Sequence, residues 1–487
     1  MNILLLLRVL GSILLVEGAA MVPALAIALV YGDGDALAFV WSILILAAIG
    51  VPLRLLCKPE QSNLRAREGF LAVALAWILL SVFGALPYLF SGVIPDFIDA
   101  LFESVSGFTT TGASIMPVVE GQPHGVMFWR SFTHWIGGMG VLVLTLALLP
   151  QMSGRTSHLV RAESPGPTLS KIAPRMGDTA KILYIVYGVL TLMNWIALML
   201  AGMDAYDAAI HALGTAGTGG FSNYAASVGH FNSAWIEGIT TFFMIVFGVN
   251  FALYYKALTG GWREAIRNEE LRWFLGIYIG VVLLITLNLM PDYEGNFLTA
   301  LRYSSFQTAS LMSTTGYATA NFAFWPVTSK ALLMLVMFTG GCAGSTAGGM
   351  KICRIGMLCK LGIREVRRTF QPRKVHTVRF EGKAVEESVL GQIAVYAFMC
   401  LLILVLGTVL VSLENPAAEL NDLESSFTAA LTCFNNVGPG LSNAIGPAGS
   451  YASYGPFAKL VLTFLMLAGR LEIFPMLALF HPAMWRK

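Results

Sequence analysis

The chain has 487 residues, of which 56% are hydrophobic and 12% are charged, with a formal net charge of +3 and a mean hydropathy of +0.70. Soluble domains carry about a quarter charged residues, so this composition excludes an ordinary soluble protein and predicts one integrated bundle of membrane-spanning helices. The six cysteines are scattered without C-x-x-C spacing, which argues against a zinc site or a disulfide framework and predicts free, packed thiols.

Apolar runs of about 20 residues, long enough to cross a bilayer, recur along the whole chain. The first run carries Arg8 and Glu17 and continues for a full span, so we interpret it as a retained helix rather than a secretory signal. The ten predicted spans lie near residues 3–31, 36–57, 69–92, 126–149, 179–202, 234–258, 272–290, 329–363, 389–413 and 456–480.

The charged residues alternate between the two sets of loops. Most Lys and Arg residues lie in the loops around 54–67, 155–181, 256–272 and 351–383 and at the C-terminus. Positive charge is retained on the cytoplasmic side, so we predict that these loops and both termini are cytoplasmic. The opposite loops are acidic. Most of these acids are ordinary solvated charges, although together they would raise the local concentration of cations in a concave vestibule.

Four of the outer loops contain a moderately apolar stretch of about ten residues, too short to cross and suited to a re-entrant half-helix. Each stretch ends in a tract centred on glycine, and a single such tract would usually be only a turn. The four segments read ALFESVSGFTTTGAS (100–114), AAIHALGTAGTGGFS (208–222), SFQTASLMSTTGYAT (305–319) and SFTAALTCFNNVGPGLS (426–442). Their fourfold recurrence predicts that they line one common pore.

Extended backbone at membrane depth is tolerated only where it is buried in protein or lines a water-filled path. Carbonyl oxygens replace the hydration shell of a cation when successive residues alternate in handedness, and glycine adopts the left-handed conformations at the least cost. Half-helices that aim their partially negative C-terminal ends at the same axis favour a cation and disfavour an anion.

The predicted fold is an all-α membrane protein in which four pseudo-repeated units surround one pore. Each unit consists of a helix, a half-helix, a glycine tract and a second helix. The predicted divisions are two extra N-terminal helices at 1–68 and units at 69–175, 176–268, 269–383 and 384–487, the third with a broken second helix.

Several motifs resemble the Trk/Ktr/HKT superfamily of cation transporters, specifically its bacterial TrkH branch, over essentially the whole chain. The first group consists of the tracts Thr110-Thr111-Gly112-Ala113, Thr218-Gly219-Gly220-Phe221, Thr314-Thr315-Gly316-Tyr317 and Asn436-Val437-Gly438-Pro439. Further matches are FWRSFTHWIGGMG (128–140), RAESPGP (161–167), GGCAGSTAGGMK (340–351) and GRLEIFP (469–475).

The resemblance implies potassium uptake across the bacterial inner membrane by a homodimer, with a cytoplasmic nucleotide-binding regulatory subunit of the TrkA type. It implies membrane lipid as the surroundings, no nucleic acid and no organic cofactor. Glycine in all four tracts favours potassium over sodium within this superfamily. The implied ion-binding residues are Thr110, Thr111, Gly112, Thr218, Gly219, Gly220, Thr314, Thr315, Gly316, Asn436, Val437 and Gly438.

The resemblance also implies a gate below these tracts, formed by an intramembrane loop and an arginine that acts as an electrostatic barrier. The gate residues are Gly340, Gly341, Gly344, Ser345, Thr346, Gly348, Gly349 and Arg470. The plainer alternatives are close helix packing through small residues and an internal ion pair between Arg470 and Glu472. The loop is not a P-loop, because it lacks Gly-Lys-Ser/Thr.

Two polar residues of the fourth predicted span are expected to have structural roles: Arg130 paired with an acid such as Glu103, and His134 packed and hydrogen-bonded. The basic run from Arg364 to Arg379 either docks a regulatory partner or holds its loop on the cytoplasmic side. A potassium symporter that couples to protons or sodium by alternating access is the alternative function. An enzyme is disfavoured, since the histidines show no ligand spacing such as H-E-x-x-H.

Overall fold

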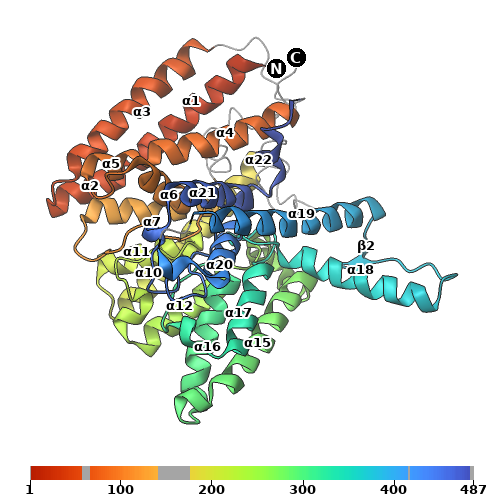
Figure 1. Ribbon diagram of the computed structural model, residues 1–487. Coiled ribbons are helices and arrows are strands. Elements are labelled where there is room, and N and C mark those ends of the chain that lie inside the picture. The colour runs from red at the N-terminus through yellow and green to blue at the C-terminus, as the bar shows by residue number, and fades with distance from the viewer. Residues whose placement is uncertain (1, 58–65, 141–175, 415–416, 483–487) are drawn as a thin grey trace.

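The computed structural model describes the chain except for residues 1, 58–65, 141–175, 415–416 and 483–487. The RAESPGP motif at 161–167, the second part of the span expected at 126–149 and most of the basic loop around 155–181 therefore lie outside the described residues. Helices dominate the described part (Figure 1), and its one sheet is the antiparallel hairpin of β1 (Arg379–Phe380) and β2 (Lys383–Ala384).

Three N-terminal helices precede the first unit. These are α1 (Ile3–Ala20), α2 (Val22–Tyr31), which continues α1 beyond Met21, and α3 (Ala36–Leu56). The backbones of α1 and α3 approach closely at Gly11 and Gly50, where a Cβ on either residue would lie 3.0 Å from the other's carbonyl oxygen. Small residues allow such contact between helices in lipid. In Figure 1 this group lies at the upper left, beside α4 and α5.

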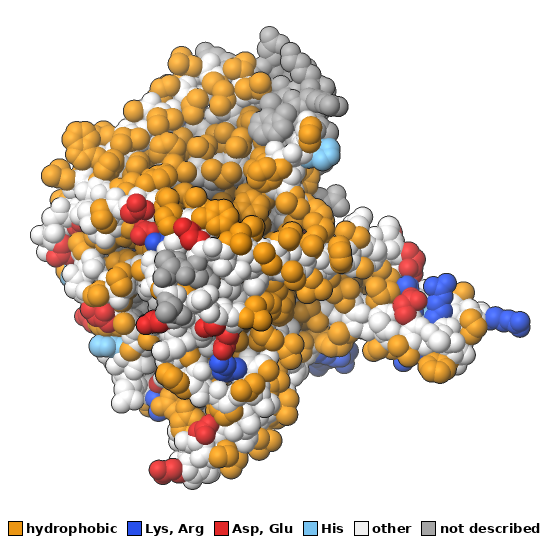
Figure 2. Space-filling view, in the orientation of Figure 1, with side chains coloured by type: hydrophobic (Ala, Val, Ile, Leu, Met, Phe, Trp, Pro, Cys, Tyr) orange, Lys and Arg blue, Asp and Glu red, His pale blue; other side chains and the backbone are white. Residues whose placement is uncertain are grey.

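Each unit begins with a long, apolar helix. These helices are α4 (Ala66–Gly84) with its continuation α5 (Leu86–Ser91), α10 (Met176–Leu200), α15 (Glu269–Leu289) and α19 (Glu387–Ser412). In the most apolar stretch of α10, only 28% of the residues are buried. The corresponding share is 61% for the α4–α5 span, which packs against α1. The exposed apolar side chains, seen as broad hydrophobic areas in Figure 2, suit contact with lipid tails.

A short half-helix follows each long helix. The four are α6 (Phe97–Phe108), α11 (Ala205–Gly217), α16 (Phe297–Met312) and α20 (Leu423–Phe434). All four begin at an N-cap whose side-chain oxygen accepts backbone N–H groups of the first turn; these residues are Asp96, Asp204, Asn296 and Asp422. Three of the outer acids therefore have a local role, which is to satisfy N–H groups that have no intrahelical partner.

The second helix of each unit is short. These helices are α7 (His124–Gly138), α12 (Ala234–Phe247), α17 (Val327–Thr339) and α21 (Pro456–Arg470), with 15, 14, 13 and 15 residues. At 1.5 Å per residue they extend about 20 Å, less than the roughly 30 Å of a hydrocarbon core. Each ends beside a glycine, and an added Cβ at Gly137 or Gly469 would clash with the carbonyl oxygen of Phe108 or Phe434.

Of the ten expected spans, one lies partly outside the described residues, and three are divided between shorter helices. Among the described residues, six helices are long and apolar enough to cross a membrane, or seven when α12 and the following helix, bent by 90°, count as one. The runs at 329–363 and 456–480 are broken at the glycines that pack against half-helix ends or turn the chain. The break in the run at 329–363 was predicted from its glycine-rich stretch, whereas the break in the run at 456–480 was not.

The remaining elements connect these helices. They are α13 (Phe251–Lys256), η3 (Ala257–Gly261), α14 (Trp262–Ile266), α18 (Ile352–Phe370), α22 (Phe474–Ala478) and the short turns η2 (Ser227–Phe231), η4 (Pro291–Tyr293), η5 (Phe322–Phe324), η6 (Ala418–Leu420) and η7 (Tyr451–Ser453). Helix α18 and the hairpin project from one side of the molecule (Figure 1).

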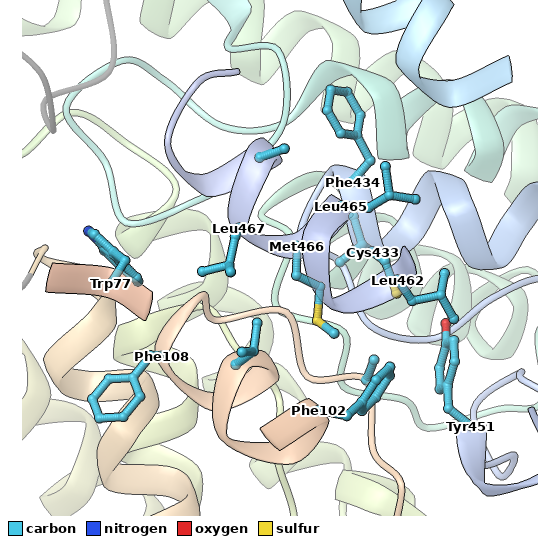
Figure 3. Packing of buried hydrophobic residues seen from close by; sticks show 14 of the residues in the cluster. Trp77, Phe102, Phe108, Cys433, Phe434, Tyr451, Leu462, Leu465, Met466 and Leu467 are labelled. Carbon is cyan, nitrogen blue, oxygen red and sulfur yellow. The ribbon is translucent and has the colours of Figure 1, made fainter. Parts of the chain in front are cut away.

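The core joins the first unit to the fourth. Figure 3 shows Phe102 of α6 facing Tyr451 and Met466 of the last unit, and the rings of Phe102 and Tyr451 lie 5.6 Å apart. Helix α6 also packs directly on α21. The four units therefore form a closed arrangement around one axis. The chain has the predicted fold class, an all-α membrane protein. Each of its four units consists of a helix, a half-helix, a tract and a second helix, and extra N-terminal helices precede them.

Candidate functional site

The C-terminal ends of the four half-helices share one hydrogen-bond pattern. The first residue of each tract is left-handed, with φ of 56° at Thr110, 55° at Thr218, 58° at Thr314 and 54° at Asn436. The N–H of the next residue donates to the carbonyl five positions earlier, in the pairs Thr111–Ser106, Gly219–Gly214, Thr315–Ser310 and Val437–Thr432, at 2.8 to 2.9 Å. This is the Schellman arrangement, in which glycine is the usual left-handed residue.

Threonine in a left-handed conformation is strained, and such strain persists only where the surroundings impose it. Two positions later the central glycine of each tract is also left-handed, with φ of 78°, 75°, 84° and 99° at Gly112, Gly220, Gly316 and Gly438. Left-handed residues therefore alternate with an ordinary residue in all four tracts. This alternation turns successive carbonyl groups toward the same side of the chain.

The four tracts touch one another in a closed ring. A Cβ added at Gly112 would strike the carbonyl oxygen of Gly219; at Gly220, that of Thr315; at Gly316, that of Val437; and at Gly438, that of Thr111. Each glycine thus lies against the backbone of the next tract, and the fourth returns to the first. A single pocket above the ring is lined by all four central glycines together with Ser114, Ser222 and Pro439.

Side-chain hydroxyl and amide groups hold the tracts in place through hydrogen bonds. The Oγ1 atoms of Thr109 and Thr111 lie 2.8 Å apart, and Ser313 Oγ and Thr315 Oγ1 lie 2.7 Å apart at the equivalent place in the third unit. The fourth tract differs, because the side-chain Nδ2 of Asn436 donates to Thr111 Oγ1 at 3.0 Å and so ties the fourth tract to the first. The tract geometry is held by the protein itself.

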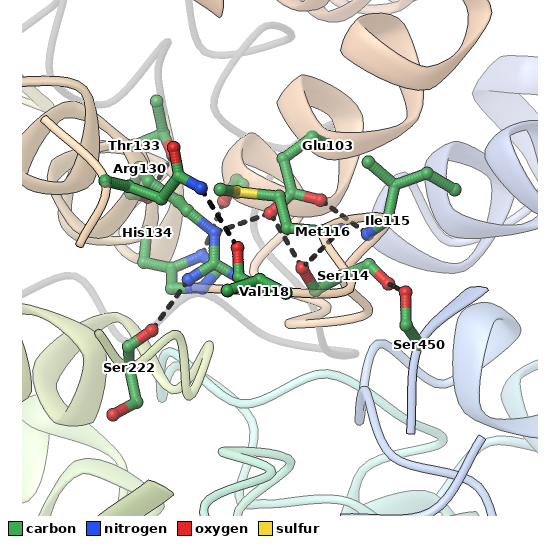
Figure 4. A network of polar contacts seen from close by, with 12 residues as sticks. Glu103, Ser114, Ile115, Met116, Val118, Arg130, Thr133, His134, Ser222 and Ser450 are labelled. Carbon is green, nitrogen blue, oxygen red and sulfur yellow. Dashed lines mark hydrogen bonds and ion pairs between the residues drawn. The ribbon is translucent and has the colours of Figure 1, made fainter. Parts of the chain in front are cut away.

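A buried ion pair supports the first two tracts (Figure 4). Arg130 Nε lies 2.5 Å from Glu103 Oε1, and both side chains are almost fully buried, at 3% and 0% exposed. The same carboxylate accepts the N–H of Ile115 at 2.7 Å and the hydroxyl of Ser114 at 3.2 Å, so it fixes the chain just after the first tract. The predicted pairing of Arg130 with Glu103 is confirmed.

The other end of Arg130 fixes the second tract. Its Nη1 donates to the carbonyl oxygen of Ser222 at 3.0 Å, and its guanidinium lies 3.5 Å from the centre of the Phe221 ring. His134 stacks on the same Phe221 ring, with the two ring centres 4.1 Å apart, and bonds through Nδ1 to the Gly107 carbonyl at 2.8 Å. The prediction of a packed, hydrogen-bonded His134 is confirmed.

Ion pairs also join three of the four neighbouring pairs of units. Glu237 of α12 bonds to Arg302 of α16, Lys330 of α17 to Glu424 of α20, and Lys459 of α21 to Asp99 of α6. The second helix of one unit is thus tied to the half-helix of the following unit at three of the four junctions. These pairs were not predicted from the sequence, since no local spacing links residues so far apart in the chain.

The fourth junction, between α7 and α11, is made by Tyr206 and His124, and Asp33 from the loop before α3 contacts it. Tyr206 donates its hydroxyl to the carbonyl oxygen of His124 at 2.7 Å, and the His124 ring stacks on Tyr31 at 3.9 Å. The carboxylate of Asp33 accepts the backbone N–H of His124 at 2.8 Å and contacts its ring Nδ1 at 2.6 Å. These bonds, first the backbone one and then the side-chain one, lower the pKa of Asp33.

The loop at 340–351 lies directly below the ring. The N–H of Gly348 donates to Thr314 Oγ1 at 2.7 Å, and a Cβ on Gly348 would lie 2.6 Å from the carbonyl oxygen of Asn435. Left-handed φ values of 62°, 73° and 72° at Gly340, Gly344 and Gly349 allow the chain to fold back on itself. The loop therefore occupies the space beneath the third and fourth tracts.

Arg470 joins this loop to the first unit. Its Nη1 donates to the carbonyl oxygen of Thr346 at 2.9 Å, and its Nη2 donates to the carbonyl oxygens of Gly137 and Gly138 at 2.6 and 2.8 Å. Glu472, the alternative partner of Arg470 that the sequence offered, is instead bonded to Arg354 at 2.6 Å. The guanidinium thus lies between the end of α7 and the 340–351 loop, below the ring.

The cysteines add nothing to this site. All six cysteines are free thiols, four of them buried, whereas the expectation of packing was wrong for the exposed Cys359. Within the described ranges, no group of three or more His, Cys, Asp or Glu side chains has a geometry suited to a metal ion.

This fold and this ring define a multi-pass membrane transport protein. A family model described as "Cation transport protein" matches residues 36–487, and the chain belongs to this TrkH family. It is accordingly a transporter and not an enzyme.

Known proteins resemble the chain over its whole length. A Trk system potassium uptake protein TrkH from Salmonella typhimurium is 39% identical over 99% of both chains, and the one from Halomonas elongata is 37% identical over 100% of both. The crystal structure of the potassium transporter TrkH from Vibrio parahaemolyticus covers 100% of both chains with a TM-score of 0.89 and 34% identity.

Proposed function

We propose that this protein takes up potassium across the bacterial cytoplasmic membrane through a channel-like selectivity filter. The twelve filter residues are Thr110, Thr111, Gly112, Thr218, Gly219, Gly220, Thr314, Thr315, Gly316, Asn436, Val437 and Gly438. Potassium is the transported ion. The observation that carries the proposal is the closed ring in which each central glycine abuts the next tract's backbone.

Backbone carbonyls suit this task because they replace the water around a cation at a modest energetic cost. The alternation of left-handed and ordinary residues in all four tracts supports such carbonyl alignment. The half-helices add the partially negative ends of their dipoles. The printed names of the relatives, each a potassium uptake protein or potassium transporter, favour potassium as the cation.

We propose further that the 340–351 loop and Arg470 form the gate. A loop that fills the space below the ring obstructs the path, and a guanidinium held there repels an approaching cation. The bonds from Arg470 to Thr346 and from Gly348 to Thr314 favour this obstructing position. Opening then requires that the loop leave Arg470 and the third tract.

The remaining proposals concern arrangement and partners. We place both termini and the basic loops in the cytoplasm, because positive charge is retained there, and we divide the units at 69–175, 176–268, 269–383 and 384–487. We propose a homodimer that works with a TrkA-type nucleotide-binding subunit. The relatives are named as parts of a Trk system, and the projecting basic helix α18 offers that subunit a contact surface.

The test is flux of potassium and sodium through purified protein in liposomes, compared with the variant Gly316→Ser. A Cβ at this left-handed position would meet Val437 in the neighbouring tract, so we expect distorted carbonyl geometry and a lower ratio of potassium to sodium flux. An unchanged ion preference in correctly assembled protein would count against the filter. Single-channel currents would also separate a channel from alternating access, which cannot give channel-like conductance.

A further inference from the structure

One buried carboxylate holds both ends of the 340–351 loop. Glu270, in the first turn of α15 and 6% exposed, accepts the N–H of Ala343 at 2.7 Å and the N–H of Cys353 at 3.1 Å through the same oxygen, Oε1. The N–H of Ile352 also donates to the carbonyl oxygen of Gly341 at 3.0 Å. The base of the loop is therefore closed and is attached to α15 through Glu270.

The start of α15 is in turn held by the hairpin of β1 and β2. Glu381, at the tip of the hairpin, accepts bonds through Oε1 from Asn268 Nδ2 at 2.7 Å, Glu269 N at 2.8 Å and Glu270 N at 3.2 Å. Its own N–H donates to Glu269 Oε2 at 2.9 Å. N–H groups in a first helical turn have no intrahelical partner, and a negative charge there is favourable, so Glu381 caps α15 from another part of the chain.

An apolar contact runs beside this hydrogen-bonded path. A Cβ at Gly356 of α18 would lie 3.1 Å from the Phe380 ring of the hairpin and 3.6 Å from Trp273 of α15. Cys353, at the end of the loop, shares a buried cluster with Val378, which precedes the hairpin. The hairpin, the first turn of α15 and the base of the loop are thus packed as one connected group.

We propose that Glu381 and Glu270 form a relay through which the position of the exposed hairpin sets the closed position of the loop. The inference rests on the proposed role of the loop as the gate. Displacing the hairpin removes the cap from α15, shifts Glu270 and weakens its hold on Ala343 and Cys353. A contact made on the hairpin, well away from the ring, thereby controls the ion path.

The experiment measures basal potassium flux in liposomes for Glu270→Ala, Glu381→Ala and the double variant, at matched amounts of folded protein. We expect flux to rise about tenfold for Glu270→Ala and severalfold for Glu381→Ala, since losing a hydrogen bond to a charged group shifts a two-state population by that order. The double variant should match Glu270→Ala, because both changes break one path. Selectivity should not change, whereas general loosening of the fold would lower it.

Two controls sharpen the result. Glu365→Ala changes an exposed acid of α18 that pairs with Arg364 and contacts neither α15 nor the loop in the described bonds, so its flux should equal the parent's. Glu270→Gln keeps an acceptor oxygen and should restore much of the closed state.

The outcomes separate the relay from the gate. Parental flux in Glu270→Ala and Glu381→Ala, while Arg470→Ala raises flux, would overturn the relay and leave the gate standing. Additive effects in the double variant would also overturn the relay, because they mean independent actions. If Arg470→Ala, Glu270→Ala and Glu381→Ala all leave flux unchanged, the gate fails and the relay fails with it.

Discussion

The ring of tracts and the loop beneath it are both rich in glycine, yet they are built differently. The same left-handed pair and the same backbone bond occur four times in the ring, once in each unit. Among the described residues, the 340–351 loop occurs in the third unit alone, and its contacts to Thr314, Phe247 and Arg470 come from different units. Repetition suits equal coordination of one ion from four sides, whereas a single element is free to move without dismantling the ring.

The strongest test of this comparison is to place a side chain in the ring. Gly220→Ala puts a Cβ at a left-handed position, which costs about 1–2 kcal/mol, and drives it into the Thr315 carbonyl oxygen of the next tract. We expect potassium uptake to fall by at least about tenfold, as measured by flux in liposomes. The matched control is Gly188→Ala in α10, where a Cβ meets nothing within 4 Å, and uptake there should be normal.

The next largest effect should have the opposite sign. Arg470→Ala removes the donors that bind Thr346 of the loop and Gly137 and Gly138 of α7, and it removes a positive charge from below the ring. We expect cation flux to rise severalfold while potassium preference is kept, because a charge near a low-dielectric path acts strongly on a passing cation. The exposed Arg267 provides the control as Arg267→Ala; lower flux in Arg470→Ala would contradict a barrier.

The sequence predicted the ring better than it predicted the helices around it. A half-helix and a glycine tract are local patterns, and they appear wherever the four segments are written out, as at Thr314 to Gly316. The second helices α12 and α21 were overestimated because their apolar runs continue through Gly248 or Gly469 even where the chain turns. Hydropathy responds to composition, whereas these turns depend on the backbone packing against a neighbour such as Phe434.

Contacts between residues that are distant in the chain were harder still to predict from the sequence. Glu103 with Arg130 was foreseen because both lie in recognisable segments of the same unit. Lys459 with Asp99 and Glu270 with the loop join residues that are distant in the chain, and a single charged residue in a sequence does not indicate its partner. Such pairs follow only from the closed arrangement of the units.

The junction between the last and first units should have a smaller effect than either glycine region. Lys459 and Asp99 are 9% and 27% exposed, so Lys459→Met leaves a partly buried carboxylate without its counter-charge. We expect a loss of about 1–3 kcal/mol in stability and a modest loss of potassium preference, since α6 carries the first tract. Thermal unfolding in detergent and the flux ratio measure the two effects.

The double variant Lys459→Met with Asp99→Asn removes both charges and should recover part of the lost stability. Neutralising the exposed pair Lys256 and Glu264, which are 47% and 71% exposed, is the matched control and should change little. Equal losses in the single and double variants would show that the ion pair does not join the two units.

The smallest expected effect concerns the partly exposed contact between Asp33, in the loop before α3, and His124 at the start of α7. The bonds from His124 lower the pKa of Asp33 in the folded protein, so the stability it contributes is present above the unfolded pKa, about 3.9, and is lost as the pH falls through the lower folded value. The contribution should stay below about 1 kcal/mol, because the pair is partly exposed. Asp33→Asn should therefore be less stable than the parent at neutral pH, and the difference should vanish in acid; a constant difference at every pH would show that the charge of Asp33 has no part in this contact.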